Sequence, residues 1–354
     1  MKIWLAVFGF LLSTLCIADE NTTINIGGYS IAPNSHLDIN IEVPKGEKDP
    51  ATIIPISVIH GSQKGPIIAT VAGVHGYEYT SILAMEEWIK TLDPASMSGT
   101  VIAVRVAHVS AFEDRSIYVN PYDRKNLNRS FPGRADGTQT ERVAWAISQN
   151  IVANADFLID LHSGDGAEWL SPFIGVYGGP LASNYELALS VAKGFNFPNV
   201  VTYKMKSKEQ VDRRRSLNRQ GVASQIPTIL VEIGENGSKV QEHVNAMKFG
   251  LSNALSLVGI SSKKVETPNT TITYFDSTQS VPVKHAGLWF PKQVGGRVVK
   301  EGETLGVLKD YFGNTLEIVK APSDGFGLYG LMGPAIKEGE SVLTIAKPVA
   351  PISQ

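Results

Sequence analysis

Apolar runs and helix-like repeats alternate along the first two thirds of the chain. Runs of apolar residues that predict buried strands lie at 51–59, 67–72, 100–106, 156–161 and 227–233. Apolar positions with helical spacing predict helices at 80–92, 140–150, 181–193 and 240–258. An alternating segment at 37–43 predicts an edge strand. Strands that alternate with helices predict an α/β domain, with a mixed, mostly parallel sheet and flanking helices.

The pattern changes near residue 265. Helical spacing ends there, and short apolar segments alternate with Gly and Pro turns. Segments 298–308 and 335–345 share the motif Lys-Glu-Gly-Glu, so they predict two similar hairpin units. We therefore expect an α/β domain over 19–264 and a small all-β domain of the barrel-sandwich kind over 265–354. Similar domains carry biotin or lipoate on a lysine between methionines, which this chain lacks, so we expect an architectural role or a rim of the site.

Two stretches of the α/β part show no periodicity. Residues 19–35 are polar and rich in Asn and Thr, and we expect a loose lead-in. Residues 108–138 contain several Asn, Arg, Gly and Pro residues and predict a long loop. A loop of that length in a compact domain is often functional.

Composition and charge narrow the class of protein. Hydrophobic residues make up 43% of the 354 residues and charged residues 19%, which is typical of a globular protein. The formal charge of -2 argues against a nucleic-acid or membrane-surface partner. The run Arg213–Arg215, with lysines at 204, 206 and 208, has two interpretations: a solvated loop, or a contact for an anionic ligand.

The first eighteen residues have the layout of a signal peptide. Lys2 precedes an apolar core at 3–12, and small residues end the segment at Ala18, where we expect cleavage. Cys16 suggests a lipoprotein as the alternative, but Leu15 stands where that signal needs a small residue. Because the chain contains one cysteine, the mature protein would have no disulfide. We expect an exported, periplasmic protein that has no membrane anchor after cleavage.

Candidate metal ligands follow two of the predicted strands. His75 and Glu78 stand three residues apart where strand 67–72 gives way to a helix, and His162 ends strand 156–161. In sheets of this kind, the carboxyl ends of parallel strands meet at one edge. Two imidazoles and one carboxylate are the protein ligands of many catalytic zinc sites. The alternative is structural, with His75 bonded in a turn and Glu78 capping the helix.

A further carboxylate lies inside an apolar strand. Glu232 ends the run 227–232, where an unpaired charge would be costly to bury. Beside a metal, it could take a proton from water and pass it to a leaving amine. Glu235, three residues later and in looser sequence, is the competing candidate.

The long loop contributes candidate cations. Arg129 could bind a substrate carboxylate through its guanidinium fork, and Asn128 could add a hydrogen bond. Arg115 could stabilise the oxyanion of a tetrahedral intermediate. The alternative for both arginines is an ion pair at the surface.

Taken in order, His75-x-x-Glu78, Asn128-Arg129, His162 and Glu232 resemble the succinylglutamate desuccinylase/aspartoacylase family, a branch of the zinc carboxypeptidase-like fold. The resemblance covers roughly residues 50 to 346. It implies one zinc ion on the two histidines and Glu78, with Glu232 as general base. It also implies that Asn128 and Arg129 hold the substrate carboxylate and that Arg115 polarises the scissile carbonyl.

The chain departs from this family in its signal peptide and in segment 204–225, which is longer and more basic than expected. We therefore expect an exported zinc hydrolase, either an N-acyl-amino-acid deacylase or a carboxypeptidase acting on peptides or cell-wall fragments. A periplasmic binding protein without turnover is the alternative from another class. The expected partner is a small carboxylate-bearing substrate or a short peptide. Tyr274, Tyr311 and Tyr329 are candidates to reach the site from the β-rich domain.

Overall fold

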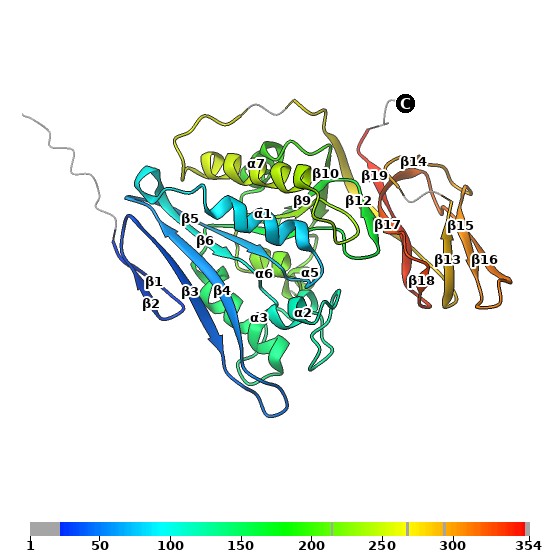
Figure 1. The fold of residues 1–354 in the computed structure, drawn as a ribbon. Helices are drawn as coiled ribbons and strands as arrows, with labels where there is room; N and C mark the ends of the chain where they lie inside the picture. The colour runs from blue at the N-terminus through cyan, green and yellow to red at the C-terminus, as the bar shows by residue number, and fades with distance from the viewer. Residues whose placement is uncertain (1–21, 214, 267–268, 293–294, 351–354) are drawn as a thin grey trace, which may run out of the picture.

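The structure is a computed structural model that describes residues 22–213, 215–266, 269–292 and 295–350. The predicted signal peptide lies outside these residues. Figure 1 shows an α/β part joined to a β-rich C-terminal part. None of the described helices is long and apolar enough to cross a membrane.

A mixed sheet forms the centre of the α/β part, and its strands lie in the order β10-β9-β11-β7-β5-β6-β4-β3. The strands are β3 (Ser35–Val43), β4 (Thr52–His60), β5 (Gln63–Ala72), β6 (Ser98–Val104), β7 (Phe157–His162), β9 (Phe173–Gly178), β10 (Asn199–Lys204) and β11 (Thr228–Glu232). Strands β6, β5, β7 and β11 pair in parallel, whereas β9 runs antiparallel to β11. The predicted mixed sheet is confirmed.

Helices cover both faces of this sheet (Figure 1). One face packs against α1 (Tyr79–Ile89), α4 (Tyr185–Gly194) and α7 (Gln241–Val258), and the other against α3 (Gln139–Asn150) and α6 (Leu217–Ala223). Trp88, Phe195 and Leu251 are fully buried on the first face. Each such side chain contributes about 1.5–3 kcal/mol by leaving water, so the two cores hold the strand ends in place.

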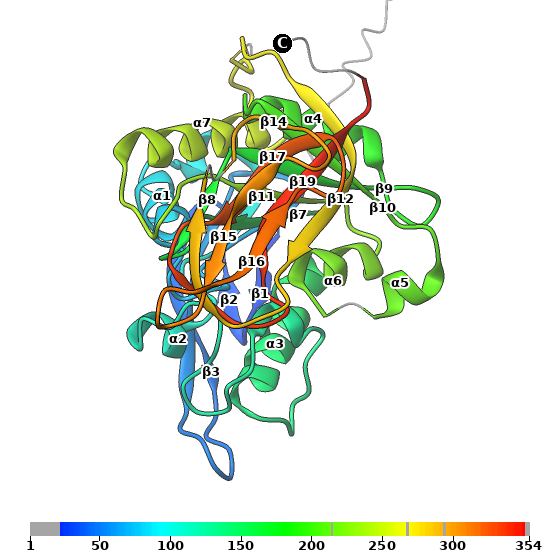
Figure 2. The ribbon, with the colours of Figure 1, turned by 90° about the vertical axis from the view of Figure 1, so that its right-hand side faces the viewer.

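The C-terminal part continues the main sheet. Its strands are β12 (Thr273–Pro282), β13 (Gly287–Pro291), β14 (Val298–Val299), β15 (Thr304–Lys309), β16 (Thr315–Lys320), β17 (Gly325–Leu331), β18 (Ala335–Ile336) and β19 (Ser341–Pro348). β12 pairs in parallel with β10 and antiparallel with β19, so one sheet runs through both parts. β16, β15, β13 and β18 form a second sheet that faces the viewer in Figure 2. The predicted all-β part is confirmed, and its predicted boundary lies in the connection between α7 and β12.

Four stretches contain more structure than their sequence predicted. The expected lead-in forms the hairpin of β1 (Ile24–Ile26) and β2 (Tyr29–Ile31), and the long loop contains α2 (Val109–Glu113) and the 3-10 turn η2 (Leu127–Arg129). Residues 163–178, for which we predicted no element, contain β8 (Glu168–Leu170) and β9, and the basic segment 204–225 contains α5 (Lys208–Asp212) and α6. Further 3-10 turns are η1 (Pro94–Ser96) and η3 (Val152–Asn154). Most of these elements are too short to show a hydrophobic period in the sequence. They form because they pair or pack with other segments of the chain.

Candidate active site

The carboxyl ends of three neighbouring strands meet at the candidate site. His75 follows β5, His162 is the last residue of β7, and Glu232 is the last residue of β11. In the parallel register of β7 and β11, Glu232 stands beside His162. The sheet therefore brings together side chains that are 70 to 157 residues apart in the sequence.

His75, Glu78 and His162 converge on one point. The Nδ1 atom of His75 lies 2.5 Å from Oε1 of Glu78, and the Nδ1 atom of His162 lies 2.8 Å from Oε2 of the same carboxylate. Their candidate ligand atoms lie within 4.8 Å of one another, and all three residues are buried. The structure thus brings together the three predicted ligands in a group that could hold a metal ion.

Two glycines shape the turn that carries His75 and Glu78. Gly73 has a φ of +69°, a conformation that suits glycine, where the chain leaves β5. A Cβ atom at Gly76 would lie 2.4 Å from the backbone of Ala111, so this glycine lets the turn pack closely against α2. Glu78 occupies the N-cap position of α1 but makes no side-chain cap hydrogen bond. Its carboxylate faces the histidines instead, which argues against the structural alternative.

The charges around Glu78 keep it ionised. Burial opposes ionisation, but His162 and His75 outweigh it and lower the pKa of Glu78 to about 2. The backbone N–H of Ser163 also donates to Oε2 of Glu78 at 3.3 Å. A carboxylate that stays charged while buried is suited to a cation.

Asp160 contacts His162 on the side of the imidazole ring that faces away from Glu78. Its Oδ1 atom lies 3.0 Å from Nε2 of His162, and the Asp160 side chain is completely buried. Such a contact leaves Nδ1 of the imidazole free to face the candidate metal position. We did not predict Asp160 from the sequence, although it is a charge inside an apolar strand, the same signal that identified Glu232.

Glu232 faces the same space. Burial raises the pKa of Glu232 well above its usual value; His162 opposes this shift, and Glu78 and Glu168 add to it. Glu232 lines the cavity beside the histidines, whereas Glu235 is not among the lining residues. The position supports Glu232 over Glu235 as the proton-transfer group.

A cavity of about 350 Å³, here called the central cavity, connects these residues with the long loop. Its lining includes His75, Glu78, Tyr118, Asn126, Asn128, Arg129, His162, Glu168, Leu170, Phe173, Tyr203, Asn218, Leu230, Glu232 and Tyr329. Asn128 is fixed because its Oδ1 accepts from the N–H of Leu217 at 3.0 Å. Arg129 donates to the carbonyl of Asn128 at 2.7 Å and has no acidic partner among the described residues. Both predicted substrate-binding residues therefore line the cavity.

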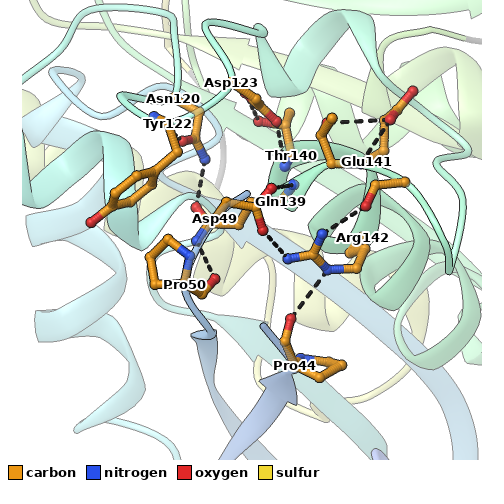
Figure 3. Close-up of polar contacts among 12 residues, drawn as sticks. Pro44, Asp49, Pro50, Asn120, Tyr122, Asp123, Gln139, Thr140, Glu141 and Arg142 are labelled. Carbon is orange, nitrogen blue, oxygen red and sulfur yellow. Dashed lines mark hydrogen bonds and ion pairs between the residues drawn. The ribbon is translucent and has the colours of Figure 1, made fainter. Parts of the chain in front are cut away.

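A buried polar cluster holds the long loop against α3 (Figure 3). Arg142 forms an ion pair with Asp49, and both side chains are buried. The second oxygen of Asp49 accepts from the N–H of Gln139 at 2.9 Å. Asn120 donates to Gln139 at 2.7 Å, and Asp123 accepts from the N–H of Thr140 at 2.9 Å. Asn120 and Asp123 thus attach the loop segment before Asn128 to the start of α3, which Asp49 in turn holds through Gln139 and Arg142.

Arg115 is not brought to the central cavity. It has a φ of +53° and lines a separate hollow with Tyr79, Phe112 and Lys239. This placement does not support its predicted role at the scissile carbonyl.

The cavity lining also includes Tyr118, Glu168 and Asn218, which, like Asp160, we did not predict from the sequence. Tyr118 makes an edge contact with His75, with ring centroids 5.0 Å apart, and its hydroxyl donates to Asp165. Burial, with Asp165 and Glu78, raises the pKa of Glu168 to about 8. Asn218 donates to Asp160 at 3.2 Å. No sequence signal marked these residues, because each lies in an irregular or short element.

One of the three candidate tyrosines of the C-terminal part reaches the cavity. Tyr329, on β17, lines it and stacks on Phe173, with ring centroids 6.1 Å apart. β17 also pairs with β8, next to Glu168. Tyr311 is 76% exposed, and neither it nor Tyr274 is among the lining residues. The β-rich part thus forms one wall of the candidate site.

The mixed sheet, the His–Glu–His group at its carboxyl edge and the β-rich wall define a two-part α/β fold with a candidate metal site at the strand ends. The chain belongs to the succinylglutamate desuccinylase/aspartoacylase family, since the model of that family's catalytic domain matches residues 64–258, more than half of the chain. The family predicted from the sequence is confirmed.

Relatives agree with this assignment. The N-alpha-acetyl-L-2,4-diaminobutyric acid deacetylase of Halomonas elongata is 27% identical over 305 residues, which cover 84% of this chain and 87% of that protein. The product-bound ectoine utilization protein EutE (DoeB) of Ruegeria pomeroyi has a TM-score of 0.78 at 24% identity, covering 90% and 97% of the two chains. A succinylglutamate desuccinylase/aspartoacylase of Rhodobacter sphaeroides has a TM-score of 0.76 at 22% identity, covering 90% and 98%. At these identities the two structures show a shared fold.

Proposed function

We propose that this protein is an exported, zinc-dependent deacylase that hydrolyses the amide bond of N-acyl amino acids. The observation that carries the proposal is the convergence of His75, Glu78 and His162 in one cavity with Glu232 and Arg129. Membership of the family and the similarity to a deacetylase of an acetylated amino acid support the reaction class.

The residues present fit a zinc ion. The donor set is two imidazoles and one carboxylate, as in many catalytic zinc sites. The Nδ1 atoms of His75 and His162 both face the Glu78 carboxylate, and Nε2 of His162 is held by Asp160 at 3.0 Å. When bound, zinc would polarise the scissile carbonyl and lower the pKa of water to about 7.

The chain's own groups would supply binding and proton transfer. Arg129 and Asn128 would hold the substrate carboxylate and so position the amide beside the histidines. Glu232 would accept a proton from the attacking water and then donate it to the leaving nitrogen. The walls formed by Tyr118 and Tyr329 would restrict access of further water to the reacting atoms.

Measuring the products released by the purified, zinc-loaded protein tests this function. We expect acetate or succinate from N-acetyl or N-succinyl amino acids, and no release of C-terminal residues from unmodified peptides. Release of C-terminal residues alone would replace the deacylase proposal with a carboxypeptidase. No turnover of either class by protein that holds zinc would favour a binding protein.

Export is a separate part of the proposal and rests on the pattern of residues 1–18. Expression of the full chain in a Gram-negative host, followed by fractionation and N-terminal sequencing, tests it. We expect a periplasmic protein that begins at Asp19. A full-length chain in the cytosolic fraction would refute export without affecting the proposed reaction.

A further inference from the structure

The hollow that contains Arg115 is a space of its own. It encloses about 390 Å³ and is here called the outer hollow. Arg115 lines it together with four aromatic or aliphatic side chains from α1 and α2: Tyr79, Ile82, Leu83 and Phe112. The linings of the outer hollow and the central cavity share no residue. Small-molecule sites commonly have volumes of about 300–1,000 Å³, so the outer hollow has room for a ligand of one or two rings but little more.

Aromatic and aliphatic side chains form the floor of the outer hollow. Tyr79 is the first residue of α1, and Ile82 and Leu83, three and four residues later, lie on the same face of that helix. Phe112, on α2, meets Tyr79 edge to face, with ring centroids 6.0 Å apart. These four side chains are half-buried, so each keeps apolar surface that a ligand could cover. A ring is the group that fits best, because aromatic side chains favour edge and offset contacts with other rings.

The charged residues of the outer hollow carry a net positive charge. Arg115 and Lys239 are exposed at its mouth, and neither forms an ion pair with another residue that the structure describes. Glu113 is the one acidic residue of the described lining, so two cations face one carboxylate. Burial and Tyr77 raise the pKa of Tyr79, and the charge of Arg115 opposes this rise, so the guanidinium lies near the aromatic floor. The ligand group that complements this charge is an anion such as a carboxylate.

The backbone at the end of α2 holds Arg115 beside Phe112. Arg115 stands two residues after the helix, with a φ of +53°, at a position where glycine is the commonest residue. Its N–H donates to the carbonyl of Phe112 at 3.1 Å, and the N–H of Ser116 donates to the carbonyl of Ala111 at 3.0 Å. These bonds close the helix end, so the cation and the ring belong to one fixed turn.

The outer hollow adjoins the turn that carries the candidate metal ligands. Tyr79 directly follows Glu78 in the chain, and α2 packs closely against Gly76 of the same turn. A ligand in the outer hollow would therefore contact the support of the metal site and not the reacting atoms. Its binding can be measured separately from any turnover in the central cavity.

We propose that the outer hollow is a second ligand site, which binds a small aromatic carboxylate. The ring of the ligand would lie on Tyr79 and Phe112, and its carboxylate would be held by Arg115 and Lys239. A neutral aromatic molecule would leave both cations without a counter-charge, and an anion without a ring would leave the floor uncovered. The inference goes beyond the proposed deacylase function and does not depend on it.

Probes of similar size separate the contribution of the charge from that of the ring. 3-Phenylpropionate is the aromatic carboxylate, 3-phenylpropanamide is its neutral partner, and propionate is the anion without a ring. Calorimetry and ligand-observed NMR measure their binding to the purified, zinc-loaded protein. The variants are Arg115→Gln/Lys239→Gln, Arg129→Ala and Arg124→Gln. Arg124 is the matched control, because it is an exposed arginine of the same long loop with a φ of +57° and does not line the outer hollow.

We expect wild type to bind 3-phenylpropionate more tightly than either comparison compound. The double glutamine variant should weaken this binding by about 3- to 30-fold, a modest loss because both cations are exposed and screened by water. Its affinity for the amide should stay within about twofold of wild type, and Arg124→Gln should match wild type with all three probes. Equal binding of the carboxylate and the amide, or of the carboxylate and propionate, would overturn the proposal.

The Arg129→Ala variant shows which of the two spaces the probe occupies. Binding that this variant keeps and the double glutamine variant loses would place the ligand in the outer hollow. Binding that Arg129→Ala loses and the double glutamine variant keeps would place it in the central cavity and overturn the proposal. If the double variant fails to fold, Lys239→Gln alone, at an exposed loop position, should still weaken binding of the carboxylate and not of the amide. An unchanged affinity for the carboxylate in that folded variant would equally overturn the site.

Discussion

The two walls of the central cavity are built in different ways. The strand wall consists of His75, His162 and Glu232, which follow or end three hydrogen-bonded parallel strands, together with Glu78 at the start of α1. The loop wall consists of Tyr118, Asn128 and Arg129 from the long loop, together with Asn218 from α6. Sheet register positions the first wall, whereas the second depends on side-chain contacts such as Asn128 with Leu217, and on the attachment of the long loop to α3, which Asp49 and Arg142 help to hold. The strand wall is therefore suited to chemistry, and the loop wall to substrate choice.

The strongest test of the strand wall is His162→Ala. Loss of one of three ligands should remove the metal and reduce activity by at least about 10⁴-fold, since metal and proton transfer would fail together. Zinc content by atomic emission, measured with turnover, checks this. A variant that holds one zinc per chain and remains active would contradict the ligand assignment.

Glu232→Gln should give the next largest effect. The amide keeps the shape but cannot accept a proton, so kcat should fall by about 10²- to 10⁴-fold while zinc content stays at the wild-type level. Glu235→Gln, on a neighbouring residue outside the cavity lining, is the control and should keep most activity. If both variants retained full turnover with every substrate, the proposed mechanism would be wrong.

Asp49→Ala tests how the loop wall is held. Removing one partner of a buried ion pair should lower the free energy of unfolding by about 3–5 kcal/mol. Chemical denaturation at pH 7 measures this, and Asp136→Ala, whose side chain is 89% exposed, should change stability by less than about 0.5 kcal/mol. A loss as small as that of the control would mean that the cluster does not fix the loop.

The ion pair of Asp49 and Arg142 also predicts that the free energy of unfolding depends on pH. Burial opposes ionisation of Asp49, but hydrogen bonds from Arg142 and Gln139 outweigh it and lower its pKa. Its contribution is therefore complete above the unfolded pKa of about 3.9 and is lost as the pH falls through the lower, folded pKa. The stability difference between wild type and Asp49→Ala should shrink below about pH 4. A difference that stayed constant down to pH 2 would contradict this sign.

Arg129→Ala should have a smaller effect that is confined to substrate binding. Loss of a charged hydrogen bond to the substrate carboxylate corresponds to about 1.5–3 kcal/mol, or roughly 10- to 150-fold in kcat/KM. Metal content should not change. Arg115→Ala, the smallest expected effect, should leave kcat/KM within about twofold of wild type, because its side chain lines a different hollow. Equal losses in both variants would remove the basis for assigning Arg129 alone to the substrate.

The difference between the strand wall and the loop wall also explains how much of the site could be predicted from the sequence. Long apolar strands with a histidine or glutamate at their ends made the strand wall predictable, because such strands can meet only at one edge of the sheet. The loop wall depends on contacts between residues far apart, such as Asn128 with Leu217, and on short elements without periodicity. Asn128 and Arg129 were found by their motif, while Tyr118, Glu168 and Asn218 carried no signal. Arg115, predicted from the same loop, lines a different hollow.

The pairing of β10 with β12 has a consequence for how the polypeptide can be shortened. Truncation after α7 would remove the strand that covers β10 and leave its hydrogen-bonding groups open to other chains, a recognised route to aggregation. It would also delete Tyr329 from the active-site wall. A fragment that contains every proposed metal ligand would therefore lack both a protected sheet margin and a complete substrate chamber.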